Sequence, residues 1–174
     1  MKKIFGILLC ACILVNMVSV PAMAVSKSLP DEIKAIALDY EWEILKLVNI
    51  ERAKEGKQAL SMLPVLQEAC DVRANDLEIS YSHTRPDGSE FSTAIPSSFK
   101  ESIKGENIAI EQKSPAEVME AWMNSPGHRA NILNSNYGYI GVGYNEKAKA
   151  WVQIFTKREA VTEFQVSTDQ TSLN

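Results

Sequence analysis

The stretch from Trp122 to Tyr144 constrains the fold of this chain more than any other part of its sequence. Its last five residues, Ile140–Tyr144, alternate between large apolar residues and glycine, which is the period of a β-strand. The apolar residues fall on one face, while Gly141 and Gly143 leave the other face bare. A bare strand face predicts that the backbone or a side chain of another element comes close to it.

The residues just before this strand predict a helix start that contains a histidine. Ser125 is a favoured N-cap, Pro126 is suited to the first helical position, and His128 falls in the first turn. Because proline follows directly, we interpret Ser125 as a cap rather than a nucleophile. The chain has only two histidines, so His83 is the expected partner of His128.

The first 24 residues have the pattern of an export signal. Two lysines precede an apolar run over residues 4–20, and residues 22–24 read Ala-Met-Ala, a small-x-small cleavage site. No stop-transfer pattern follows. We therefore predict a removed signal peptide (1–24), no membrane span after its removal, and a secreted protein, with association to the cell envelope as a variant of that location. Lipid attachment at Cys10 or Cys12 is disfavoured, because the apolar run continues past both.

Composition argues against a nucleic-acid partner and an internal disulfide. The chain has 18 basic and 22 acidic residues, a formal net charge of −4 and no Lys/Arg-rich run, so it lacks the basic patch that tracks phosphates. Two of its three cysteines lie in the predicted signal peptide. Cys70 is left without a partner. Its place in an apolar helical stripe predicts a small buried thiol.

Helical periodicity predicts three helices before the C-terminal strands, over residues 36–54, 64–83 and 115–122. Gly56 should end the first in a left-handed cap, and Ser114 should begin the third with a capping box. The second helix should bury one stripe and leave its acids and Arg73 on the opposite side. The buried stripe comprises Leu66, Cys70, Ala74, Leu77 and Tyr81.

Extended segments are predicted at residues 105–110, 140–144 and 151–156, and the last two should form an antiparallel hairpin. Residues 89–104 lack periodicity and are predicted to form a long loop. The order of elements predicts an α+β fold in which helices cover a small antiparallel sheet. Trp122, Trp151 and Phe155 are assigned to its core.

Three separated motifs resemble the bacterial extracellular domains of the CAP superfamily, also called SCP-like domains. They are GENIA (105–109), SPGHRANIL (125–133) and IGVGY (140–144). Residues 48–60 also resemble the first helix of that family, and residues 83–88 its first histidine segment. The resemblance implies an α-β-α sandwich. It divides the chain into a signal peptide, a lead-in (25–37), a CAP/SCP-like domain (38–158) and a polar tail (159–174).

The family has a cavity with two histidines and two glutamates, and three of these positions are matched. His83, Glu106 and His128 fit the two histidines and one glutamate, whereas Ser125 stands where the second glutamate is expected, three residues after Trp122. Two imidazoles and a carboxylate are suitable metal ligands for Zn²⁺. The same three residues are candidates for catalytic acid–base work. Taken without the family, His128 and Glu106 fit structural roles, as a helix-start hydrogen-bonding group and a backbone cap.

These features predict a secreted binding or signalling module with a His/Glu-lined cleft, beside which Gly141 or Gly143 opens space. The cleft is expected to take a divalent metal, a small lipid or sterol, a peptide or a cell-wall ligand. The alternative is an extracellular hydrolase that is metal-assisted or His/Glu-dependent. The missing second glutamate favours the module. The sequence leaves open whether the protein is an enzyme and which oligomer it forms.

Overall fold

The structure is a computed structural model that describes residues 29–97 and 104–157. The predicted signal peptide (1–24) and polar tail (159–174) lie outside the described residues. The elements, in chain order, are α1 (Leu29–Lys54), β1 (Ser61–Met62), α2 (Pro64–Ile79), the 3-10 helix η1 (Phe91–Ala94), β2 (Lys104–Ile110), α3 (Pro115–Asn124), α4 (Pro126–Leu133), β3 (Tyr137–Asn145) and β4 (Ala150–Lys157). None of the helices in these ranges combines the length and apolarity needed to cross a membrane.

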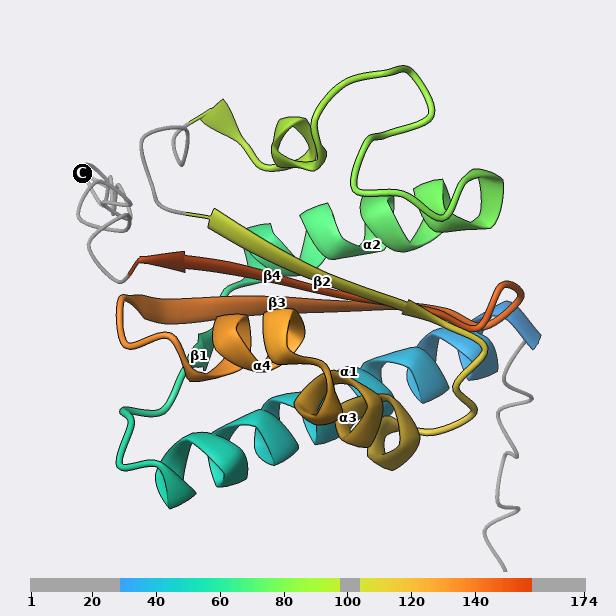
Figure 1. Cartoon of the computed structure of the whole chain (residues 1–174). Coiled ribbons are helices and arrows are strands. Elements are labelled where there is room, and N and C mark those ends of the chain that lie inside the picture. Colours follow the sequence, from blue (N-terminus) through green and yellow to red (C-terminus); the bar gives the residue numbers. More distant parts are fainter. Residues whose placement is uncertain (1–28, 98–103, 158–174) are drawn as a thin grey trace, which may run out of the picture.

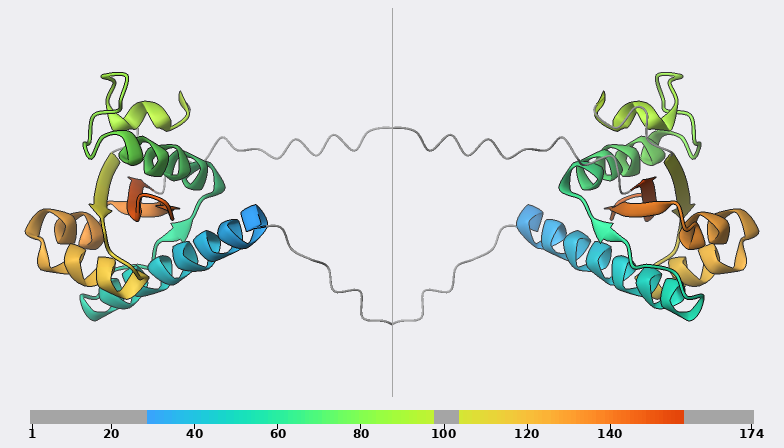
Figure 2. Two further views of the ribbon diagram at one scale, coloured as in Figure 1. Left: turned by 90° about the vertical axis from the view of Figure 1, so that its right-hand side faces the viewer. Right: turned by 90° about the vertical axis from the view of Figure 1, so that its left-hand side faces the viewer.

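The elements form three layers around a four-stranded sheet of order β1-β3-β4-β2. Helices α1, α3 and α4 cover one face and α2 covers the other (Figures 1 and 2). The predicted α+β class and the layered arrangement are confirmed. The sheet is mixed rather than purely antiparallel, because β1 pairs in parallel with β3. At two residues, β1 is too short to show a period in the sequence.

Two helix ends differ from the sequence prediction. Helix α1 begins at Leu29 rather than at residue 36, so part of the predicted lead-in is helical, and it ends as predicted before Gly56, whose φ is 63°. Helix α2 ends at Ile79, because Ser80 is already extended. Tyr81 therefore leaves the helical stripe and is 54% exposed, so its assignment to the core was wrong.

The starts of α3 and α4 follow the predicted cap positions, with differences in their hydrogen bonds. Ser114 Oγ accepts from the backbone N–H of Glu117 at 3.2 Å, but the Glu117 carboxylate accepts from the N–H of Lys113, one residue before the cap. Ser125 occupies the N-cap of α4, yet its side chain makes no capping hydrogen bond.

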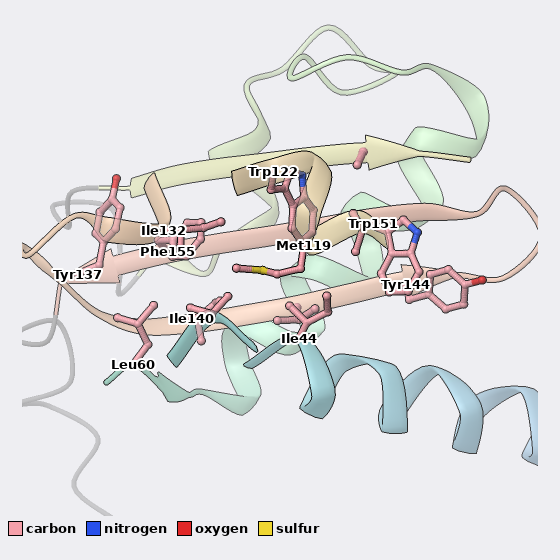
Figure 3. Packing of buried hydrophobic residues seen from close by; sticks show 14 residues of the cluster. Ile44, Leu60, Met119, Trp122, Ile132, Tyr137, Ile140, Tyr144, Trp151 and Phe155 are labelled. Atoms are coloured by element: carbon pink, nitrogen blue, oxygen red, sulfur yellow. The ribbon is translucent and has the colours of Figure 1, made fainter. Parts of the chain in front are cut away.

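Apolar residues fill the space on both faces of the sheet. On the α1/α3/α4 face, Trp122, Trp151 and Phe155 are almost fully buried, as predicted (Figure 3). On the α2 face, Val152 and Ile154 pack with the apolar stripe of α2. That stripe includes Cys70, which is fully buried and is not in a disulfide. The predicted buried thiol is confirmed.

The bare face of β3 is in direct contact with the backbone of α2. A Cβ atom added to Gly141 would lie 2.3 Å from the carbonyl oxygen of Leu66, and one added to Gly143 would lie 2.4 Å from that of Cys70. The predicted close approach is confirmed. The expectation that these glycines open space beside the histidines was wrong, because α2 fills that space.

We expect Gly141→Ala and Gly143→Ala each to lower the free energy of unfolding by about 1–3 kcal/mol or more, since the new methyl group would overlap main-chain atoms. Urea denaturation followed by circular dichroism measures this. Gly127→Ala is the matched control, because a Cβ there meets nothing within 4 Å. Equal stability of the two β3 variants and the control would contradict the close contact.

Beyond β1, side chains cover the outer edge of β3. The backbone N–H of Val142 donates to Gln67 Oε1 at 3.2 Å, and Gln67 Nε2 donates to the carboxyl of Glu41. Glu41 also accepts from the backbone of Tyr144 and is only 4% exposed. Burial, followed by the nearby charge of Asp71, raises the pKa of Glu41 from 4.5 to about 8.

The Glu41 carboxyl predicts a loss of stability at alkaline pH. Its pKa is higher in the folded than in the unfolded chain, so the stability it contributes is complete below about pH 4.5 and is lost as the pH rises through about 8. Glu41→Gln should remove this loss, which is on the order of a few kcal/mol. Urea denaturation of both proteins between acidic and alkaline pH tests it. Glu43→Gln, at a half-exposed position of the same helix, should behave like wild type. A wild-type pH profile for Glu41→Gln would refute the assignment.

Candidate functional site

The candidate site lies along the outer edge of β2, where groups from both faces of the sheet meet. Strand β2 pairs with β4 on one side, and its other edge receives side chains. The carbonyl of Ile108 accepts from Tyr81 Oη at 3.3 Å and from Trp122 Nε1 at 3.4 Å. The carbonyl of Glu106 accepts from Asn131 Nδ2 at 3.3 Å. Elements that cover opposite faces are therefore brought together at this edge.

His83 and Glu106 are in direct contact. Nδ1 of His83 lies 2.7 Å from Oε2 of Glu106, and the imidazole side chain is 57% exposed while the carboxylate is 1% exposed. Since Tyr81 reaches Ile108 and His83 reaches Glu106, this segment runs antiparallel to β2. A carboxylate only accepts hydrogen bonds, so Nδ1 of His83 is the donor. In the neutral imidazole this tautomer leaves the lone pair on Nε2.

Arg73 holds the other side of the same carboxylate. Its Nε donates to Glu106 Oε1 at 2.7 Å and its second terminal nitrogen to Oε2 at 3.4 Å. Burial lowers the pKa of Arg73, but its hydrogen bond to Glu106 and the charge of that residue outweigh burial and raise it. Arg73 is fully buried, so its predicted place on the polar side of the helix was wrong. Helical spacing carried the missed signal, because Arg73 lies in register with Cys70 and Leu77.

Asp76 ties the histidine segment to α2. Its Oδ2 accepts from Arg73 at 3.0 Å and from Nε of Arg85 at 2.8 Å, and Arg73 also donates to the carbonyl of Ser82 at 2.7 Å. The two arginines thus face the carboxylates of Asp76 and Glu106. This balanced set of charges fixes the backbone on both sides of His83.

The Arg73–Glu106 pair offers a direct comparison with an exposed pair of equal length. Arg129 and Glu55 also lie 2.7 Å apart, but their side chains are 45% and 47% exposed. We expect Arg73→Met to cost about 3–5 kcal/mol, because a buried carboxylate loses its countercharge. Arg129→Met should cost about 0–1 kcal/mol. Urea denaturation measures both, and equal losses would show that the Glu106 carboxylate is not effectively buried.

His128 reaches the edge from α4. Asn107 Nδ2 donates to the backbone carbonyl of His128 at 3.1 Å, and Asn131 Nδ2 donates to Asn107 Oδ1 at 2.9 Å. These hydrogen bonds hold α4 against β2. Burial, and then the charge of His83, lowers the pKa of His128 below 6.5. The two imidazoles are therefore near enough to repel each other when both are protonated, and His128 is neutral at pH 7.

The predicted site residues are brought together to different degrees. His83 contacts Glu106 directly, whereas His128 is coupled to His83 through its charge. Across residues 29–97 and 104–157, no three His, Cys, Asp or Glu side chains are grouped so that they could hold a metal ion. The zinc site formed by all three residues stays a prediction. Ser125 lies at the start of α4 with its hydroxyl free of a capping bond.

The fold agrees with the family whose sequence model matches this chain. The model of the CAP family, described as the cysteine-rich secretory protein family, matches residues 45–156. The chain belongs to the CAP family. The predicted resemblance is thereby confirmed, over a range close to the one expected from the motifs.

Relatives and solved structures place this CAP domain among bacterial proteins. It is 40% identical over 119 residues to the uncharacterized protein YkwD of Bacillus subtilis, a match that covers 67% of this chain and 46% of that protein. It superimposes with a TM-score of 0.68 and 25% identity on an extracellular protein containing a SCP domain from Bacillus anthracis, covering 75% of this chain and 44% of that one. An outer surface protein from Borrelia burgdorferi shares the fold alone, with a TM-score of 0.57 and 22% identity over 66% of this chain and 90% of that one. The chain spans less than half the length of the curated relatives it matches.

Proposed function

We propose that this CAP domain is a secreted binding module in which His83 and His128 bind a divalent metal ion. The observation that carries the proposal is the 2.7 Å contact between His83 Nδ1 and Glu106. Metal-bound histidines usually donate their other ring N–H to a carboxylate, which orients the ring and raises its basicity. In this arrangement Glu106 orients the metal ligand His83 and does not bind the ion itself.

The observed contacts fit a site with two imidazole ligands better than the predicted site with His83, Glu106 and His128 as ligands. Zinc needs neutral imidazoles, and the lowered pKa of His128 supplies one at pH 7. Because Nδ1 of His83 donates to Glu106, Nε2 is the ring nitrogen through which the exposed imidazole would bind an ion. Glu106 is less suited to bind the ion itself, because Arg73 occupies both of its oxygens. A zinc ion held by two histidines would leave coordination positions open for water or for a donor atom of a ligand.

The same features favour binding over catalysis. Both oxygens of the buried Glu106 carboxylate already accept hydrogen bonds, from Arg73 and from His83, so Glu106 is poorly placed to exchange a proton with a substrate. Ser125 occupies the position of the second family glutamate, so no second carboxylate is supplied there. Secretion is supported by the predicted signal peptide and by the extracellular description of the Bacillus anthracis neighbour.

The metal proposal predicts pH-dependent zinc binding that needs both histidines. Calorimetric titration with Zn²⁺ should show binding at neutral pH that weakens below about pH 6.5, as the imidazoles become protonated. His128→Ala and His83→Ala should each lose most of this binding while remaining folded. Ser125→Glu should strengthen it by roughly tenfold, about 1.4 kcal/mol, by adding a carboxylate at the site.

Asn124→Glu is the matched control for Ser125→Glu, because it adds the same charge one residue away. Equal strengthening by the two would indicate general electrostatic attraction, and unchanged binding by both histidine variants would place zinc elsewhere. The hydrolase alternative is favoured by one observation, the carboxylate that orients His83 as it would orient a general base. Hydrolysis of a peptide library or an ester that is abolished in His83→Ala, with or without zinc, would support that alternative against the module.

A further inference from the structure

A groove lies between α1 and α3, on the face of the sheet opposite α2. Its volume is about 360 Å³, which is near the lower end of the roughly 300–1,000 Å³ that ligand pockets span. None of the residues that line it belongs to the His83–Glu106–His128 site. Its floor and rim are formed mainly by Leu47, Met119, Met123, Glu51, Glu120 and Asn124.

The floor of the α1–α3 groove is apolar and adaptable. Met119 is buried beside Trp122 in the core (Figure 3), while Leu47 and Met123 are partly exposed. Methionine side chains are flexible and polarisable, so they adjust to the shapes of different apolar partners. The floor therefore suits an inserted aliphatic side chain.

The rim is acidic on both walls. Glu51 belongs to α1 and Glu120 to α3, so an occupant would meet a carboxylate on either side. Glu51 is paired with the exposed Lys54 at 2.6 Å, a type of contact worth only about 0–1 kcal/mol that an incoming cation can replace. Within the described residues, Glu120 has no hydrogen-bond or ion-pair partner, so its charge is uncompensated by a direct contact. An anionic ligand, such as a fatty acid, would be repelled.

We propose that the α1–α3 groove docks a basic amphipathic peptide segment of a partner protein. An aliphatic side chain of the segment inserts between the helices, and flanking Lys or Arg side chains pair with Glu120 and Glu51. Charge complementarity selects this occupant, since apolar contacts alone would accept a neutral or an acidic segment equally well. The proposal is independent of metal binding at the histidines.

The test uses three short fluorescein-labelled peptides with the folded protein. The first carries leucines on one helical face and lysines on the other, the second has glutamate in place of lysine, and the third has serine in place of leucine. Fluorescence anisotropy should show binding of the first alone, and this binding should weaken with added salt. Glu120→Gln and Glu51→Gln should each weaken it by roughly twofold to fivefold, the effect of one exposed ion pair.

Glu117→Gln is the matched control, because Glu117 is on α3 but does not line the groove. It should leave the affinity unchanged, and Met123→Ala should reduce it through lost apolar contact. Circular dichroism confirms that each variant is folded. The proposal would be overturned if the lysine peptide showed no saturable binding, or if the glutamate peptide bound equally well. It would also be overturned if oleate bound in preference to the lysine peptide, or if Glu117→Gln and Glu120→Gln had equal effects.

Discussion

The close approach of α2 to the bare face of β3 sets the geometry of the elements around it. At Gly141 and Gly143, main-chain atoms of α2 occupy the space where side chains would otherwise stand. With α2 held this close, Arg73 reaches the carboxylate of Glu106 on the edge strand at 2.7 Å. The segment that follows α2 then runs along β2 and places His83 beside Glu106. The placement of the site therefore depends on two positions that have no side chain and do not touch it.

Both edges of the sheet are closed by side chains, and the site uses one of these closures. Tyr81, Trp122 and Asn131 bond carbonyl groups on the outer edge of β2, while Gln67 and Glu41 cover the edge of β3 beyond its short partner strand. Open sheet edges invite pairing with other chains. The side chains that cover the outer edge of β2 come from elements on opposite faces of the sheet, and the two histidines lie near them.

Local patterns predicted most of the local structure apart from some helix ends, and the error at Arg73 arose because a distant residue decides its burial. The proline-led starts of three helices and the alternation in β3 and β4 were sufficient to place those elements. Arg73 was assigned to solvent because of its charge, although its spacing placed it among buried residues. Its partner Glu106 lies on another element, so no local pattern could reveal the pairing. The family motifs named His83 and Glu106, which lie in contact, but they carry no information about Arg73, which pairs with the same carboxylate.

The strand order has a consequence for when the site can form. His83, Glu106 and His128 all precede β3, whereas the described strand that pairs with β2 is β4, Ala150–Lys157. Of the described strands, β4 is the last in chain order, and contacts between segments distant in sequence form slowly. A growing or truncated chain that stops before Ala150 therefore has His83, Glu106 and His128 but lacks the strand that pairs with β2 and positions Glu106. Completion of the hairpin, rather than synthesis of the histidines, creates the site.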